Sequence, residues 1–122
     1  MVSGLSGVLG IGLGAFGAHG LQARLLVAGT LSAWKTAVLY HLVHTAALLA
    51  VALFASSQQG AENRWAQRAG LWWAVGIVLF SGSLYVLALG GPRWLGPVTP
   101  IGGVAFIIGW AMLLPAAAKS SR

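Results

Sequence analysis

The sequence predicts an all-α integral membrane protein, a four-helix bundle with short loops that forms a single transmembrane domain over residues 1–122. Of the 122 residues, 58% are hydrophobic and 7% are charged, and the mean hydropathy is +0.86. A soluble domain carries roughly a quarter charged residues, so this chain lacks the side chains that a water-facing surface needs. Four apolar runs come close to or reach the roughly 20 residues that cross the hydrocarbon core. Each run carries a stripe of small or polar residues.

The first run covers about residues 3–20. No Lys or Arg precedes it, and a cleaved signal peptide needs a positive segment there, so we expect a retained helix. Glycines recur at helical spacing on one face, at Gly7, Gly10, Gly14 and Gly17. Glycine lets a neighbouring backbone approach closely, and packing is the main attraction between helices in lipid, so these positions predict a helix-packing face. A nucleotide-binding loop is excluded because no strand precedes the glycines.

Residues 20–32 are ambiguous. If they form a short interfacial helix, their leucines face lipid while Gln22 and Arg24 face water.

The second run covers about residues 33–55. On a helical projection, Tyr40, His41, His44 and Thr45 share one arc, and bulky aliphatic residues fill the opposite side. Uncompensated polar groups are costly in lipid, so this arc should point into the bundle.

The polar segment 56–69 predicts an aqueous loop between the second and third runs. The third run, about residues 70–89, presents a matching face that includes Ser81 and Tyr85. Gly-Gly-Pro cannot continue a helix, so a tight turn is expected at residues 90–93.

The fourth run covers about residues 98–118. Thr99 is a competent N-cap and Pro100 loses no hydrogen bond in a first helical turn. Gly102 and Gly109 belong to its small stripe, which we expect to pack against another helix.

Charge excludes several functions. Glu62 is the single acidic residue and there are no cysteines, so paired-carboxylate catalysis, Ser-His-Asp catalysis and thiolate metal sites are not available.

The net charge is +6, but the seven basic residues are scattered between apolar runs and form no nucleic-acid-binding patch. They are typical of anchors at the surface of a lipid bilayer.

Four spans place both termini on the side of the polar loop. That side carries Arg64, Arg68, Lys119 and Arg122, and the opposite side carries Arg24, Lys35 and Arg93. The excess of one charge predicts cytoplasmic termini. For Lys35, two interpretations stay open: a lysine that snorkels to the interface, or a cationic site for a lipid phosphate.

The candidate functional cluster is intramembrane and polar, and consists of Tyr40, His41, His44, Ser81, Ser83 and Tyr85. Intramembrane histidines suggest a metal, haem or proton-relay site. A metal needs further ligands, and two histidines on one helix cannot flank a haem iron from opposite sides. The preferred interpretation is therefore structural, with neutral histidines that hydrogen-bond Tyr85, Ser81, Ser83 or Thr99. We expect no cofactor and no metal.

Several motifs resemble a known family. They are Gly14–Leu21 (GAFGAHGL), Trp34–Ala37 (WKTA) followed by Tyr40–His44 (YHLVH), Phe80–Tyr85 (FSGSLY), and Thr99–Gly103 (TPIGG) with Gly109-Trp110. The sequence is similar to the domain of unknown function 423 family, small integral membrane proteins of bacteria with mitochondrial relatives. The resemblance implies a four-helix protein of the bacterial inner membrane with no settled activity. It also implies glutamine at the position of His41, which counts against an obligatory two-histidine site.

The functional prediction is a non-enzymatic structural or accessory membrane component, either with a membrane-protein partner or as a homo-oligomer. Gly76, Gly82 and Gly103 lie off the packing stripes and are the basis for expecting further helix contacts. The alternative is a small-molecule or lipid transport or binding module that uses Tyr40, His44, Ser81 and Tyr85. A membrane enzyme is the least favoured interpretation.

Overall fold

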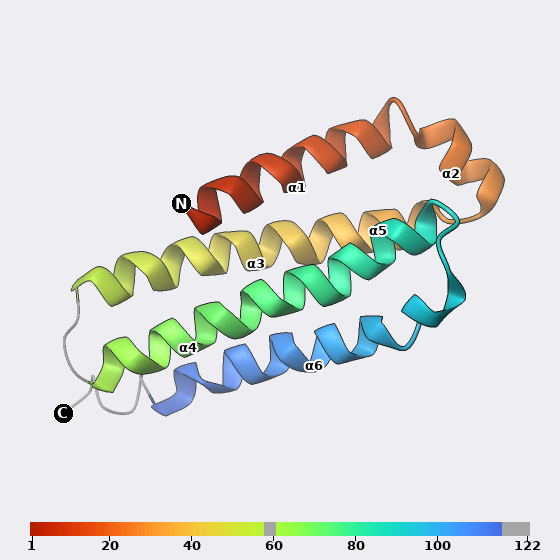
Figure 1. The fold of residues 1–122 in the computed structure, drawn as a ribbon. Helices are drawn as coiled ribbons and strands as arrows, with labels where there is room; N and C mark the ends of the chain where they lie inside the picture. The colour runs from red at the N-terminus through yellow and green to blue at the C-terminus, as the bar shows by residue number, and fades with distance from the viewer. Residues whose placement is uncertain (58–60, 116–122) are drawn as a thin grey trace.

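The computed structural model describes residues 1–57 and 61–115, and all of the regular elements in these ranges are helical. This confirms the all-α fold class. The long elements are α1 (Val2–Ala18), α3 (Leu31–Ser57), α4 (Ala61–Gly76) with the π-helical turn η1 (Ile77–Ser81) and α5 (Gly82–Ala88), and α6 (Val98–Ala111). Two short elements, α2 (Gln22–Ala28) and the 3₁₀ turn η2 (Arg93–Leu95), connect them at one end (Figure 1).

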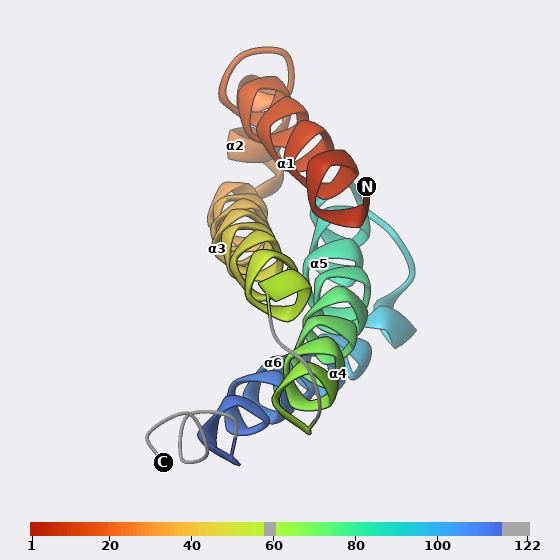
Figure 2. The same ribbon diagram turned by 90° about the vertical axis from the view of Figure 1, so that its left-hand side faces the viewer.

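The four long segments form a rhombus rather than a square. Figure 2 shows α3 beside the α4–η1–α5 segment at the centre, with α1 and α6 at opposite ends of the arrangement. α1 packs mainly on α3, and α6 packs mainly on α4 and η1. The molecule therefore has two outer interfaces that are joined through one central helix pair.

Three segments are long and apolar enough to cross a membrane: Leu31–Ser57, Asn63–Ala88 and Arg93–Pro115. α1 contains 17 residues, the lower limit for crossing the hydrocarbon core. α1 and α2 together make a fourth candidate if this pair, bent by 71°, counts as one span. In Figure 1, α1 runs alongside α3.

The ambiguous segment after the first run does contain a helix, α2. Its Leu25 is fully buried and packs in a core cluster with Trp34 and Tyr85, so this leucine does not face lipid as an interfacial helix would require. The Arg24 guanidinium donates to the Leu89 carbonyl at 3.2 Å, and the Thr30 hydroxyl donates to the Ala88 carbonyl at 2.8 Å. α2 and its flanks therefore close one end of the bundle over the end of α5.

The expected loop 56–69 is largely helical. α3 extends through Ser57, and the hydroxyls of Ser56 and Ser57 donate to backbone carbonyls three residues earlier. α4 begins at Ala61, well before the expected start of the third span at residue 70. In this segment the polar side chains indicate exposure to water, not the absence of a helix. Residues 58–60 of this loop, and residues 116–118 of the fourth run, lie outside the described residues, as do Lys119 and Arg122.

The glycine faces lie at the helix contacts. Gly7, Gly10, Gly14 and Gly17 of α1 all face side chains of α3. Gly102 of α6 lies against the backbone of Phe80, and an added methyl group would be 2.7 Å from the Phe80 Cα. Gly109 lies against Trp73, and its added methyl would be 3.1 Å from the Ala69 carbonyl oxygen. At Gly102 and Gly109 the helices lie closer than a larger residue allows.

Candidate functional site

His41 lies on the side of α3 that faces α1 and α5, and it is 4% exposed. Its Nδ1 atom is 3.1 Å from the Tyr85 hydroxyl, and its Nε2 atom is 3.1 Å from the Ser6 hydroxyl. Ser6 is also 2.6 Å from the Thr45 hydroxyl, which itself donates to the His41 carbonyl. Three helical segments thus meet in one buried hydrogen-bond network.

The bond from the Thr45 hydroxyl to the His41 carbonyl determines which groups donate and which accept in the rest of this network. Because the Thr45 hydrogen is used on a carbonyl, Ser6 must donate to Thr45. Ser6 then accepts from His41, so Nε2 carries the imidazole hydrogen and Nδ1 accepts from Tyr85. These partners assign a neutral imidazole whose two ring nitrogens are both satisfied.

His44 lies one turn further along α3 and faces α6 instead. Its Nδ1 atom is 2.8 Å from the Tyr40 carbonyl oxygen, and its Nε2 atom accepts from the Trp110 indole at 3.1 Å. A carbonyl only accepts and an indole only donates, so Nδ1 carries the hydrogen and Nε2 does not. The ring stacks on Phe106, with centroids 3.7 Å apart and planes 12° from parallel. The two histidines are therefore held as opposite neutral tautomers.

The other candidate residues divide between separate contacts. The Ser81 hydroxyl donates to the Ala37 carbonyl at 2.8 Å, and Ser83 pairs with Thr99 at 2.6 Å. Tyr85 joins the His41 network. Tyr40 is 41% exposed, and its hydroxyl has no hydrogen-bond partner among the described residues. The structure thus does not bring Tyr40, His44, Ser81 and Tyr85 into one continuous cluster.

Several residues of the two networks were missed by sequence reasoning. Ser6 adjoins the glycine face of the first run, and no contact with His44 was predicted for Trp73 or Trp110, which lie beside it. Thr99, expected as an N-cap, lies inside the first turn of α6, which Pro97 precedes, and bonds to Ser83. The helical spacing could have identified Ser6, because it lies four residues before Gly10 and therefore shares the glycine face.

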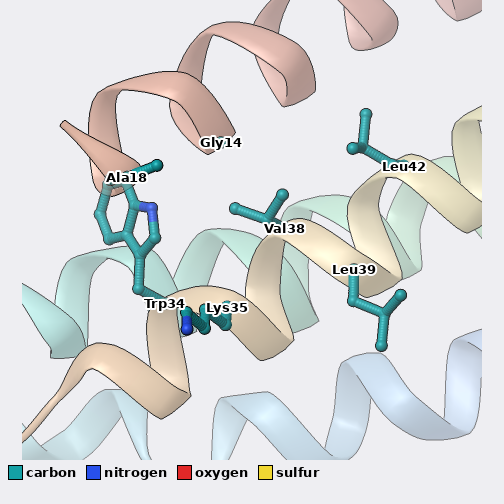
Figure 3. A pocket seen from close by; sticks show the side chains of 8 residues that line it. Gly14, Ala18, Trp34, Lys35, Val38, Leu39 and Leu42 are labelled. Atoms are coloured by element: carbon teal, nitrogen blue, oxygen red, sulfur yellow. The ribbon is translucent and has the colours of Figure 1, made fainter. Parts of the chain in front are cut away.

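Two grooves open on the lipid-facing surface. One lies between α1 and α3, has a volume of about 300 Å³, and is bordered by Gly14, Trp34, Lys35 and Val38 among others (Figure 3). The other lies between α3 and α6, has a volume of about 400 Å³, and is bordered by residues that include Tyr40, His44 and Phe106. Both are almost entirely apolar, apart from Lys35 in the first and Tyr40 with His44 in the second.

Comparison with known proteins decides the family. The family model described as "Protein of unknown function (DUF423)" matches residues 13–103. The chain is 44% identical over 119 residues to the UPF0382 membrane protein YwdK of Bacillus subtilis, covering 98% of this chain and 94% of the relative. This chain belongs to the DUF423 family.

Similar membrane proteins occur well beyond Bacillus. A UPF0382 membrane protein of Haemophilus influenzae is 45% identical over 116 residues, or 95% of this chain and 90% of the relative. The UPF0382 membrane protein C1782.12c of Schizosaccharomyces pombe is 41% identical over 118 residues, or 93% of this chain and 95% of the relative. No solved structure matches the chain. With its long apolar helices, this DUF423 chain is a membrane protein.

The chemistry open to this DUF423 protein is limited by the way its histidines are held. A metal ligand needs a free imidazole lone pair, but the Nδ1 lone pair of His41 accepts from Tyr85 and the Nε2 lone pair of His44 accepts from Trp110. Within residues 1–57 and 61–115, no three His, Cys, Asp or Glu residues gather closely enough to hold a metal ion. Binding a metal would require breaking a buried hydrogen bond in either network.

Proposed function

We propose that this protein is a non-enzymatic structural or accessory component of the membrane. The observation that carries the proposal is that its buried polar side chains bond to one another across helices. The His41 network joins α1, α3 and α5, and the His44 contact joins α3 to α6. Such bonds are each worth about 1 kcal/mol or less in a membrane, but together they define which helices are neighbours.

The outward faces suit contact with lipid and with partner helices. On α1, an added methyl group at Gly4 or Gly12 would meet nothing within 4 Å, so both glycines leave room for another backbone. Gly76 is not available for this purpose, because its added methyl would collide with Phe106. Gly82 and Gly103 have only ordinary contacts and remain open. The proposal therefore includes a membrane-protein partner or a homo-oligomer.

Photo-crosslinking in native membranes tests this function. A photoreactive amino acid at Val8 or Ile107, which are 72% and 68% exposed, samples the α1 and α6 faces. The same group at Val78, which is 69% exposed on η1, serves as a control on the central segment. We expect a recurrent protein adduct, either a second copy or one partner, from at least one outer face and not from Val78. Adducts with lipid alone from both faces contradict the proposal.

We further propose a multi-pass protein of the bacterial inner membrane with both termini in the cytoplasm. The start of α4, the helix that carries Arg64 and Arg68, lies near the end of the molecule that holds the N-terminus (Figure 1). The other end holds α2 with Arg24, the start of α3 with Lys35, and η2 with Arg93. Because the chain has no cysteine, single variants report the topology directly. An impermeant maleimide should label Pro92→Cys in intact cells and Ser57→Cys only after lysis. The reverse pattern places the termini outside.

The second candidate is a small-molecule or lipid binding module. It is favoured by the groove between α3 and α6, where the unpartnered Tyr40 hydroxyl borders an apolar channel beside His44. This function predicts a co-purifying small molecule or lipid that Gly103→Leu removes, since Gly103 borders the groove with room for a side chain. If wild type and Gly103→Leu carry the same bound molecules, this candidate fails.

A further inference from the structure

The groove between α1 and α3 combines an apolar channel with one cation. Gly14 and Ala18 of α1 leave the space, and Val38 and Leu42 of α3 form its floor (Figure 3). The Trp34 indole fixes one wall, because it packs against Gly17 and donates to the Leu13 carbonyl at 3.1 Å. The groove is thus part of a well-defined helix contact.

Lys35 borders the same groove and is exposed. It makes no hydrogen bond or ion pair with any described residue. The single acidic side chain of the sequence, Glu62, belongs to α4, which begins at the opposite end of the molecule from the start of α3 (Figure 1). The groove therefore presents a free positive charge beside an apolar channel.

The position of Lys35 along α3 matches the boundary between hydrocarbon and headgroups. α3 has 27 residues, which rise about 40 Å, whereas the hydrocarbon core is about 30 Å thick. About 5 Å of helix thus extends beyond the core at each end. Lys35 lies four residues from the start of α3, or about 6 Å along its axis. From there to Leu42 the groove extends about 10 Å toward the membrane centre.

We propose that this groove binds an acidic phospholipid. One acyl chain lies along Gly14, Val38 and Leu42, and the lipid phosphate pairs with the Lys35 ammonium. The cation selects the headgroup, because an anionic lipid gains attraction that a zwitterionic lipid largely lacks. The apolar channel supplies affinity because an acyl chain that fills it contacts side chains of both helices. The inference is independent of any protein partner of the outer faces.

Lipid exchange followed by native mass spectrometry tests the proposal. Purified full-length protein is exposed to equal amounts of phosphatidylglycerol and phosphatidylcholine with identical acyl chains. We expect one retained lipid, with phosphatidylglycerol favoured about fivefold, the ratio that one cation near an anionic lipid supplies. Lys35→Gln should abolish this preference and Lys35→Arg should keep it. Arg93→Gln removes an equal charge at the same end but outside the groove, and should also keep it.

A matched pair of blocking variants tests the channel itself. Ala18→Phe fills the groove, whereas Ala15→Phe makes the same change at an exposed residue of α1 that does not border it. Only Ala18→Phe should lose the retained lipid, whatever its headgroup. Equal retention of both lipids by wild type overturns the proposal, as does equal loss of preference in Lys35→Gln and Arg93→Gln. A lipid-free dimer that Ala18→Phe dissociates assigns the groove to a second copy instead. If Ala18→Phe does not fold, the Lys35 and Arg93 variants still decide.

Discussion

The two outer interfaces of the rhombus solve the same problem with different chemistry. Between α1 and α3, the contact centres on His41 and a chain of hydroxyl groups. The glycines of α1 face side chains, from the flexible Leu42 at Gly10 to the fixed Trp34 indole at Gly17. Between α6 and the central pair, the contact centres on His44 stacked on Phe106, and Gly102 lies directly on the backbone of Phe80. One interface is hydrogen-bonded and adaptable at Gly10, whereas the other is aromatic and brings backbones into direct contact at Gly102.

This difference shows that one residue type on one helix serves two purposes. His41 and His44 lie three positions apart on α3, a rotation of about 60° about the helix axis. Across this rotation His41 bonds to α1 and α5, and His44 bonds to α6. His41 acts through its two nitrogens, both bonded to hydroxyl groups. His44 adds the flat surface of its ring to its two bonds. The aromatic interface should therefore tolerate less change in shape, and the hydroxyl interface less change in hydrogen bonding.

The largest expected loss of stability comes from a substitution at the glycine contacts. Gly102→Ala places a methyl group against the Phe80 backbone, which cannot move without shifting η1. We expect it to lower the free energy of unfolding by about 3 kcal/mol, at the upper end of overpacking effects. Gly10→Ala meets the tip of Leu42 at 2.7 Å, and this flexible side chain can rotate away. Its effect should stay below about 1 kcal/mol.

Reversible unfolding in bicelles measures both variants, and the difference between them is the quantity of interest. Gly12→Ala is the control, because its methyl group would meet nothing within 4 Å. Equal losses for Gly102→Ala and Gly10→Ala would mean that the two interfaces are equally rigid, and the distinction between them would then be lost.

A glutamine exchange at the two histidines separates hydrogen bonding from ring packing. Glutamine offers one amide oxygen and one NH₂ group, so Gln at position 41 can accept from Tyr85 and donate to Ser6. We expect His41→Gln to change the free energy of unfolding by about 0.5 kcal/mol. It is also the residue that the family resemblance implies here. His44→Gln loses the stack on Phe106, and the expected cost is about 2 kcal/mol.

Near-ultraviolet circular dichroism during thermal unfolding reports these variants, because Trp73 and Trp110 surround His44 and their signal depends on that packing. His44→Phe is the matched control, since it keeps a flat ring but offers no acceptor to Trp110. The thermal stability of His44→Phe should lie between those of wild type and His44→Gln. A larger loss at position 41 than at position 44 would reverse the assignment of roles.

The sequence predicted the fold well because hydropathy and helical phase are local properties. The apolar runs, the glycine face of the first run and most of the buried arc of the second run follow from residue spacing. The prediction was wrong for Tyr40 of that arc, which is 41% exposed.

Of the partners expected across the arc, Tyr85 does bond to His41, whereas Ser81, Ser83 and Thr99 bond elsewhere, because side-chain partners depend on which helices are neighbours. His44 lies against Phe106 and Trp110, two residues for which no contact with a histidine was predicted. Segment 56–69 was wrongly predicted as a loop, because polar side chains indicate exposure to water in loops and helices alike.

Removing single hydroxyl groups should cost less stability than Gly102→Ala or His44→Gln. Tyr85→Phe removes the donor to His41 Nδ1 and leaves a buried acceptor without a partner, so we expect a loss of about 1 kcal/mol. Tyr40→Phe removes a hydroxyl that has no partner among the described residues and should change stability by less than about 0.5 kcal/mol. Nitrogen-15 NMR should find hydrogen on Nε2 of His41 and on Nδ1 of His44 in wild type. Tyr85→Phe should shift only the His41 Nδ1 signal, and identical tautomers at both positions would contradict the two-network description.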